Sequence, residues 1–308
     1  MEIIHGFNRI KRFKKPVVAL GVFDGVHLGH RAILKAIARK ARFIRGTAMV
    51  LTFFPHPQGQ SSLYSLEHRL RLIAELGIDV CVVIKFSRAF AKIPAESFIK
   101  DILVKKINAH YVYVGKNFRF GKNASGDFSL LKRYSRIYGF RLKGFEVIKA
   151  NHRNISSTYI RRLIAAGNLE LAKKMLGCPV SVFGTVIKGT SLAEKMGFPT
   201  ANINPHHEIL PPSGIYAVQV ILNKNKLNGV CYIGRRPTFS MQSLRGKIKN
   251  LKHVEVHIFN FHKNIYGENL EIQFLKKIRD EQKFSSTPPL VEQIKKDIKV
   301  SQKLFSRH

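Results

Sequence analysis

The stretch Leu20-Gly-Val-Phe-Asp-Gly-Val-His-Leu-Gly-His30 decides the first part of the fold. An apolar run at residues 16–20 precedes it and is typical of a buried strand. Residues 31–42 follow it, with apolar side chains at helical spacing and basic residues on the opposite face. The sequence therefore predicts a strand, a glycine-containing turn and a helix.

His27 and His30 lie at the start of the predicted helix, and their spacing of three puts both rings on one face. A helix N-terminus attracts anions through its free N–H groups and its dipole. Gly25 and Gly29 let the backbone approach a phosphate closely. Two imidazoles there can stabilise the charge that builds up on departing pyrophosphate. A zinc site would need a third ligand, and none is suitably spaced nearby.

An isolated pair of histidines with this spacing would be interpreted as surface or core-capping residues. Here the pair belongs to a longer motif with complete spacing, made of Gly21, Phe23, Asp24, His27, Gly29 and His30. The motif resembles the GxFDxxHxGH signature of the nucleotidylyltransferase superfamily, whose members transfer AMP or CMP onto a phosphate. The phosphate-binding interpretation is therefore favoured.

The composition indicates a globular chain of 308 residues, long enough for two domains, with 45% hydrophobic residues. Three separate cysteines fit no metal-binding pattern and are typical of a reducing compartment. Neither a signal peptide nor a membrane-spanning apolar run is found. We therefore expect a soluble, cytoplasmic protein.

The charge is strongly positive, since 53 Lys and Arg residues face 19 Asp and Glu, giving a formal +34. Such a field attracts nucleic acid, membrane headgroups or nucleotides. The basic residues are spread along the chain, however, and the local clusters at 9–15, 35–45 and 245–252 are not interleaved with stacking aromatics. Solvated faces are the favoured explanation, and a nucleic-acid partner is not expected.

The first half alternates strands and helices. Strands are predicted at 16–20, 48–54, 79–84, 111–114 and 140–147, with helices at 31–42, 66–76, 95–106 and 127–138. Helices between strands indicate a parallel sheet with right-handed crossovers. Ligands bind such sheets beyond the carboxyl ends of the strands, where His27, Pro55 and Gly115 fall.

The pattern changes near residue 180. Two short helices are predicted within 155–175, and after them come short strands at 183–187, 215–222, 228–233, 254–261 and 270–274. This rhythm predicts an antiparallel barrel or sandwich, closed by a basic amphipathic helix at 289–304. The predicted domains are residues 1–179 and 180–308.

Three further groups of residues suit phosphate chemistry. Ser156, Ser157 and Thr158 could simply cap a helix, but their hydroxyls and the Arg161 guanidinium could also bind a polyphosphate together. Thr200 and Asn202 project to one side of an extended segment and suit Mg²⁺, although a structural asparagine after a proline turn is the simpler alternative.

Glu255 alternates with buried-type valines in the stretch Val254-Glu-Val-His-Ile258, so Glu255 and His257 share a strand face. A carboxylate there can accept the proton of a hydroxyl that attacks a γ-phosphate. An exposed carboxylate without a chemical role is the ordinary alternative for such a position.

Taken together, these segments resemble the bifunctional riboflavin kinase/FAD synthetase family of bacteria over nearly the whole chain. The matching stretches include GVFDGVHLGH, TFFPHP, VGKNFRFGKNASGDF, ISSTYIR, MGFPTANI, GIYAV, IGRRPTF, VEVHIFNF, YGENLEIQF and IRDEQKF. The resemblance implies an N-terminal Rossmann-like FMN adenylyltransferase domain with a parallel sheet. It also implies a C-terminal antiparallel β-barrel flavokinase domain with a closing helix.

The resemblance also implies the roles of individual residues. ATP in adenylyl transfer would be held by Gly21, Phe23, Asp24, His27, His30, Ser157, Thr158 and Arg161, with the two histidines acting in catalysis. Flavin would lie near Asn117 in the first domain and near Arg279 and Glu281 in the second. Mg²⁺ would be held by Thr200 and Asn202, and Glu255 would be the kinase base. The implied substrates are ATP, riboflavin and FMN, and the product is FAD.

Two segments depart from the family pattern. Ser191, Ala193 and Glu194 replace two glycines and an arginine of the usual loop before the GFPTAN stretch, and residues 245–252 are longer and more basic. Two other functions stay open: a nucleotidylyltransferase for another phosphorylated substrate whose barrel is a binding module, and a nucleic-acid-binding protein with a degenerate enzyme fold. The intact motifs disfavour both.

Overall fold

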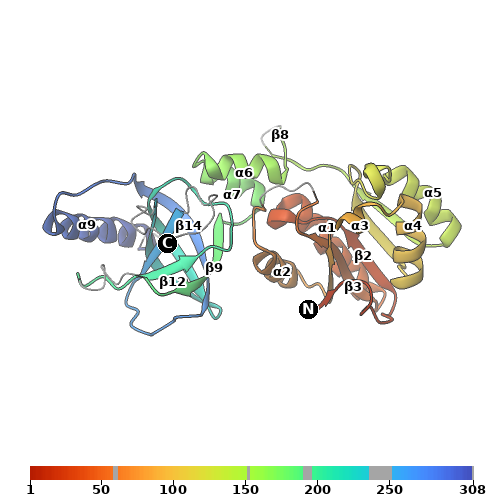
Figure 1. Ribbon diagram of the computed structural model, residues 1–308, viewed down its shortest axis with the longest axis horizontal. Coiled ribbons are helices and arrows are strands. Elements are labelled where there is room, and N and C mark those ends of the chain that lie inside the picture. Colours follow the sequence, from red (N-terminus) through yellow and green to blue (C-terminus); the bar gives the residue numbers. More distant parts are fainter. Residues whose placement is uncertain (58–61, 151–152, 190–195, 236–251, 307–308) are drawn as a thin grey trace. The chain divides into compact units, whose positions relative to one another are not determined.

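A computed structural model describes residues 1–57, 62–150, 153–189, 196–235 and 252–306 (Figure 1). The departures at Ser191, Ala193 and Glu194, and residues 245–251 of the basic segment, lie outside these ranges. The chain forms two compact units, Met1–Tyr159 and Ile160–His308. Within the described residues, no helix is long and apolar enough to span a membrane.

The first unit is built on a six-stranded sheet in the order β1-β4-β3-β2-β5-β6, with every neighbouring pair parallel. Its strands are β1 (Glu2–His5), β2 (Pro16–Leu20), β3 (Thr47–Phe54), β4 (Val80–Lys85), β5 (Tyr111–Gly115) and β6 (Arg141–Phe145). The predicted parallel sheet is confirmed, and β1 is a sixth strand that the sequence interpretation missed. The order reverses between β2 and β5, so the carboxyl ends of these two strands flank the crevice in which such sheets bind ligands.

Helices cover the sheet because the crossovers between parallel strands run over its faces. They are α1 (Leu28–Phe43), α2 (Leu66–Glu75), α3 (Arg88–Ala91), α4 (Ala95–Ser97), the π-helical η2 (Phe98–Lys106) and α5 (Phe128–Tyr138), with short 3-10 turns η1 (Asp24–Val26) and η3 (Lys122–Ala124). A small hairpin of β7 (Lys149–Ala150) and β8 (Arg153–Asn154) follows. Strand β2 is fully buried, as its uninterrupted apolar sequence predicts.

Two helices, α6 (Ser157–Ala165) and α7 (Leu169–Leu176), follow the hairpin, as predicted for 155–175. The division by compactness falls inside α6, after Tyr159, whereas the sequence interpretation places the boundary after residue 179. The exact boundary of an independently folding domain therefore stays a prediction.

The second unit contains a closed antiparallel barrel in the order β10-β13-β12-β11-β14-β9. Its strands are β9 (Ser181–Ile187), β10 (Ala201–Asn204), β11 (Gly214–Leu222), β12 (Asn225–Arg235), β13 (Lys252–Ile258) and β14 (Asn269–Arg279). A long helix, α9 (Thr287–Phe305), lies beside the barrel, in dark blue in Figure 1. The barrel and its closing helix confirm the prediction, and closure leaves the sheet without an open edge.

Candidate active sites

The turn after β2 carries the first predicted site and has an unusual backbone. Phe23, Gly25 and Val26 have positive φ angles of 54°, 75° and 40°. A Cβ on Gly25 would also lie 2.5 Å from the Leu63 side chain. Two non-glycine residues in this conformation need support from their surroundings. Gly25 is therefore required by its own backbone angle and by packing, and not only by access to a ligand.

His27 and His30 lie side by side, as predicted, although His27 is the N-cap of α1 and stands outside the helix. Their rings stack with centroids 3.6 Å apart and an 18° angle between planes. The Nδ1 atom of His27 accepts the backbone N–H of His30 at 3.4 Å. A neutral His27 must then carry its proton on Nε2, which leaves that N–H as a donor. Gly29 leaves room for this arrangement, since a Cβ there would lie 3.2 Å from the His27 ring.

Burial keeps both rings uncharged. Removal from water lowers the pKa of His27 from 6.5 to about 4. Burial also lowers the pKa of His30 well below its usual value, with further lowering from His27 and from the charge of Arg69. The Nδ1 atom of His30 is buried and has no hydrogen-bond partner among the described residues. The site therefore presents two neutral imidazoles, with unused hydrogen-bonding capacity, at the N-terminus of a 16-residue helix.

Asp24 and Phe23 support the turn from inside. The Asp24 carboxylate is buried and accepts the backbone N–H groups of Leu63 at 2.8 Å and Tyr64 at 3.4 Å. The buried Phe23 ring packs edge-on against His30, with ring centroids 5.3 Å apart. Gly21 lies against the Phe23 ring. In this structure the three residues shape the turn.

The second predicted phosphate motif begins α6. Ser157 donates its hydroxyl hydrogen bond to the backbone carbonyl of Asp24 at 2.9 Å, which joins the two motifs. The neighbouring hydroxyl of Ser156 accepts the backbone N–H of Tyr159 at 3.3 Å, as a cap does. Thr158 lies in the first turn of α6, and Arg161 lies three residues further along the helix in the second unit.

Asn117 follows the carboxyl end of β5, the strand that pairs with β2. It is exposed, in a turn closed by the Phe118 N–H donating to the Gly115 carbonyl at 2.9 Å. The turn after β2 that carries His27 and His30 is called the histidine turn below. Because β2 and β5 are neighbours, Asn117 and the histidine turn lie at the same edge of the sheet, where the strand order reverses. A phosphate site beside a flavin site fits this placement.

The barrel holds a pocket of about 410 Å³ that brings together all five residues predicted for the second site. These are Thr200, Asn202, Glu255, Arg279 and Glu281. Val254 and Val256 are fully buried on the other side of β13, so the predicted strand alternation is correct. The wall includes Leu290 and Ile294 from the apolar face of α9.

Glu255 is held between two polar side chains. The Thr200 hydroxyl lies 3.5 Å from Oε2 of Glu255, and Nε2 of His253 contacts Oε1. His257, on the same strand face, lies with Nδ1 2.8 Å from the carbonyl oxygen of Pro199. One carboxylate therefore faces the pocket with both oxygens oriented.

Asn202 lies opposite Glu255 in the ladder between β10 and β13. Its Oδ1 atom is buried and has no hydrogen-bond partner among the described residues. A Cβ on Gly189 would lie 1.9 Å from Nδ2 of Asn202, so a larger residue there would displace the amide. A buried, unpartnered carbonyl oxygen next to a threonine hydroxyl fits an oxygen-ligated cation such as Mg²⁺.

Arg279 and Glu281 lie at the pocket wall, but each has a partner. Both Nε and Nη2 of Arg279 donate to the Asp297 carboxylate of α9, at distances down to 2.9 Å and 2.7 Å. The Tyr232 hydroxyl donates to Glu281. Burial is the main cause that raises the pKa of Tyr232, and this hydrogen bond raises it further, so the hydroxyl stays protonated. Arg279 thus joins β14 to α9 as well as lining the pocket.

Sequence reasoning missed His253, Tyr232 and Asp297, the partners of the predicted residues. Tyr232 and Asp297 contact residues of other elements, so no local pattern marks them. His253 lies two residues before Glu255 on β13, so the same strand alternation that pairs Glu255 with His257 could have identified it. The apolar spacing of 289–304 did contain a usable signal, since its Leu290 and Ile294 face the pocket.

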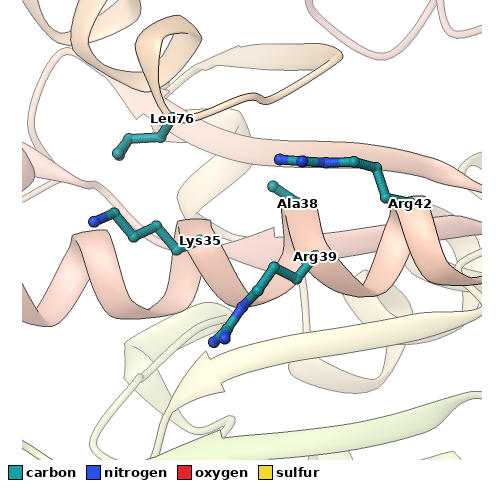
Figure 2. A pocket seen from close by; sticks show the side chains of 5 residues that line it. All are labelled: Lys35, Ala38, Arg39, Arg42 and Leu76. Atoms are coloured by element: carbon teal, nitrogen blue, oxygen red, sulfur yellow. The ribbon is translucent and has the colours of Figure 1, made fainter.

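A second cavity, of about 320 Å³, is lined by residues of α1 and by Leu76 at the end of α2 in the first unit. Figure 2 shows Lys35 and Arg42 on the side of Leu76, and Arg39 directed the other way. In the described part of the chain, none of these three cations pairs with a carboxylate. The cavity holds no residue of either predicted site.

Comparison with known proteins identifies the family of each half of the chain. A family model described as FAD synthetase matches residues 9–159, and one described as riboflavin kinase matches residues 176–305. The bifunctional riboflavin kinase/FMN adenylyltransferase of Escherichia coli (strain K12) is 35% identical, over 99% of this chain and 98% of its own. The protein of that name from Buchnera aphidicola subsp. Schizaphis graminum is 36% identical over 99% of both chains.

A further bacterial relative and a solved structure are similar over nearly the whole chain. The Bacillus subtilis bifunctional riboflavin kinase/FMN adenylyltransferase is 34% identical, over 99% of this chain and 98% of its own. A crystal structure of a macrolide-efflux protein from Streptococcus pneumoniae has a TM-score of 0.82 and 29% identity, over 98% of this chain and 99% of that one. From the two family models and the full-length relatives, this chain belongs to the bifunctional riboflavin kinase/FMN adenylyltransferase family.

Proposed function

We propose that the chain makes FMN from riboflavin at the barrel pocket and FAD from FMN at the histidine turn. Both activities are those of its family, with ATP, riboflavin and FMN as substrates and FAD as product. The observation that carries the assignment of sites is the barrel pocket, which gathers all five kinase-site residues that the sequence indicates.

In the kinase reaction, a ribityl hydroxyl of riboflavin attacks the γ-phosphorus of ATP and ADP leaves. The hydroxyl must lose its proton, and Glu255 is the residue proposed to accept it. Thr200 and His253 hold both oxygens of Glu255, which directs the carboxylate into the pocket. Arg279 and Glu281 form the wall proposed to contact the flavin, with Tyr232 and Asp297 holding them.

Thr200 and Asn202 are proposed to bind Mg²⁺ on the ATP phosphates. When bound, the ion would neutralise charge that develops on the transferred phosphoryl group. The buried Oδ1 of Asn202, without a partner in the described residues, supports this assignment.

In the adenylyl transfer, a phosphate oxygen of FMN attacks the α-phosphorus of ATP, and pyrophosphate leaves as the bond to the bridging oxygen breaks. The attacking phosphate is already an anion, so this step needs positioning and charge stabilisation but no base. Neutral His27 and His30 are proposed to donate N–H groups to the phosphates. Ser157, Thr158 and Arg161 of α6 are proposed to assist them, and Asn117 is proposed to contact the flavin.

The remaining proposals concern the setting of the enzyme. We infer a cytoplasmic location, since the proposed substrates ATP, riboflavin and FMN are small water-soluble molecules. We also infer that nucleic acid is not a partner. We also propose that residues 180–308 fold and phosphorylate riboflavin alone, because the barrel has a buried core of its own. An insoluble or molten fragment from several start points between residues 177 and 183 would contradict that boundary.

The test of the whole assignment is a time course. The purified protein is incubated with riboflavin, ATP and Mg²⁺, and FMN, FAD and pyrophosphate are resolved over time. We expect FMN to appear first and FAD to follow with equimolar pyrophosphate. A protein that converts another phosphorylated substrate but leaves riboflavin and FMN unchanged would contradict the assignment.

A further inference from the structure

A buried arginine lies behind the histidine turn. Arg69 comes from α2, outside both phosphate motifs, and is 1% exposed. No carboxylate among the described residues forms an ion pair with it. Burial lowers its pKa, and the charge of the nearby Asp24 opposes that effect. A cation is expensive to bury in this way, whereas an apolar side chain of similar volume would pack without that cost.

The hydrogen bonds of Arg69 go to the backbone around the turn. Its Nη1 donates to the carbonyl of Val22 at 2.7 Å, and its Nη2 donates to the carbonyl of Phe53 at 3.2 Å. Val22 is the residue immediately before the positive-φ segment, and Phe53 lies near the end of β3. The guanidinium thus connects the start of the histidine turn to the neighbouring strand.

Side chains donate hydrogen bonds to three carbonyls of the same turn, those of residues 22, 24 and 26. Val22 accepts a second hydrogen bond, from the buried Thr52 hydroxyl, at 2.8 Å. Ser157 donates to the carbonyl of Asp24, and Arg31 donates to that of Val26 at 3.1 Å. Residues in sparsely populated backbone conformations persist only when the surrounding structure fixes them. Arg69 is the member of this set that is both buried and charged.

We propose that Arg69 is a positioning residue for adenylyl transfer, which fixes the strained turn and thereby places His27 and His30 against the ATP phosphates. Its charge also lies close enough to His30 to oppose protonation of that ring. The inference rests on the proposed role of the histidine turn. It adds a residue from α2 that no motif in the sequence marks.

The test compares variants in the full-length protein. Arg69→Met removes the charge and both hydrogen bonds, Arg69→Lys keeps the charge, and Thr52→Val removes only the second donor to Val22. Arg71→Met is the matched control, because Arg71 lies on the same helix and pairs with Glu75 at its surface. Steady-state kinetics of FAD formation from FMN and ATP are measured below the melting temperature of each variant.

We expect Arg69→Met to lower kcat for FAD formation by about 10- to 100-fold, because small misplacements of reacting groups have effects of that size. KM for FMN should change little, since Arg69 positions His27 and His30, and these rings are proposed to act on the charge of the transition state. Arg69→Lys should recover part of the loss. Thr52→Val should lower kcat by about fivefold, the equivalent of one net hydrogen bond. Arg71→Met should match the parent.

A purely structural role predicts a lower melting temperature with an unchanged kcat in the folded protein. Folded Arg69→Met and Thr52→Val proteins with the parental kcat would therefore overturn the proposal. If Arg69→Met does not fold, parental kcat in both Arg69→Lys and Thr52→Val overturns it instead. Failure of the site itself is distinguished by His30→Ala: an unchanged rate of FAD formation in that variant contradicts the site, not only the role of Arg69.

Discussion

The two candidate sites differ in the kind of groups that they bring to a phosphate. The histidine turn has two neutral imidazoles at a helix N-terminus. Its carboxylate, that of Asp24, accepts hydrogen bonds from the backbone N–H groups of residues 63 and 64. The lining of the barrel pocket includes three carboxylates, those of Glu255, Glu281 and Asp297, and both oxygens of Glu255 have polar partners. This difference suits the two proposed nucleophiles, since an FMN phosphate is ready to attack whereas a riboflavin hydroxyl must lose a proton.

The largest expected effect sharpens this comparison at the barrel. Glu255→Gln keeps the shape of the side chain but cannot accept the proton. Riboflavin phosphorylation should fall by roughly 10²–10⁴ in kcat with little change in KM. FAD formation from supplied FMN should be unaffected. Glu268→Gln, an exposed carboxylate of the same unit, is the control. A folded Glu255→Gln enzyme with the parental kinase rate would remove Glu255 from the mechanism.

The reciprocal change is expected at the histidine turn. His27→Ala or His30→Ala should lower FAD formation by about 10²–10³, because each removes one positioned donor to the transition state. FMN formation should be retained. His110→Ala, an exposed histidine of the first unit, serves as the control. Equal loss of both activities in a folded variant would contradict the assignment of two sites.

A smaller effect concerns the pH dependence of stability in the first unit. Folding lowers the pKa of His27 from 6.5 to about 4, so the unfolded chain binds more protons between these values. The stability that depends on neutral His27 is fully present above pH 6.5 and is lost as the pH falls toward 4, because protonation of His27 favours the unfolded chain. By pH 5 the free energy of unfolding should have dropped by about 2 kcal/mol from this group.

Urea unfolding of the parent and of His27→Gln at pH 7 and pH 5 measures that contribution. The glutamine variant should lose less stability between the two pH values than the parent loses. Equal losses in the two proteins would show that His27 is not buried in its neutral form.

The smallest expected effect concerns the cation site. Asn202→Ala removes Oδ1, a buried atom that has no hydrogen-bond partner among the described residues. The Mg²⁺ concentration for half-maximal riboflavin phosphorylation should rise about tenfold or more. Asn204→Ala is the control, since its exposed amide, on the same strand, accepts the His206 N–H at 3.2 Å. An unchanged Mg²⁺ requirement in Asn202→Ala would exclude this residue as a ligand.

The sequence was sufficient for the parts of the fold that depend on local pattern. Residues 16–20 form β2 as predicted, and residues 127–138 form α5 with Asp127 as its N-cap. Strand β1 was missed because its four residues have only one buried side chain and are defined by pairing with β4. A short strand of that kind has no pattern of its own.

The candidate sites show the same limit. His27, Thr200 and Glu255 belong to contiguous motifs and were found from spacing, whereas Arg69 and Asp297 act through contacts with other elements. The structure also changes one physical explanation. Gly25 was expected to admit a phosphate, but its positive φ and the Leu63 side chain already require glycine there. Contacts between residues that lie far apart in the sequence can be identified only from the folded structure.

The central claim is that the two reactions occur at two sites, each complete without the other. Mixing two variants tests it most directly. Glu255→Gln and His30→Ala are each incubated with riboflavin, ATP and Mg²⁺, separately and as an equimolar mixture, and FAD is measured over time. Each variant alone should make little FAD, because one cannot supply FMN and the other cannot adenylylate it. The mixture should make FAD after a lag in which free FMN accumulates. A mixture of folded variants that makes no more FAD than either alone, despite free FMN in solution, would contradict the claim.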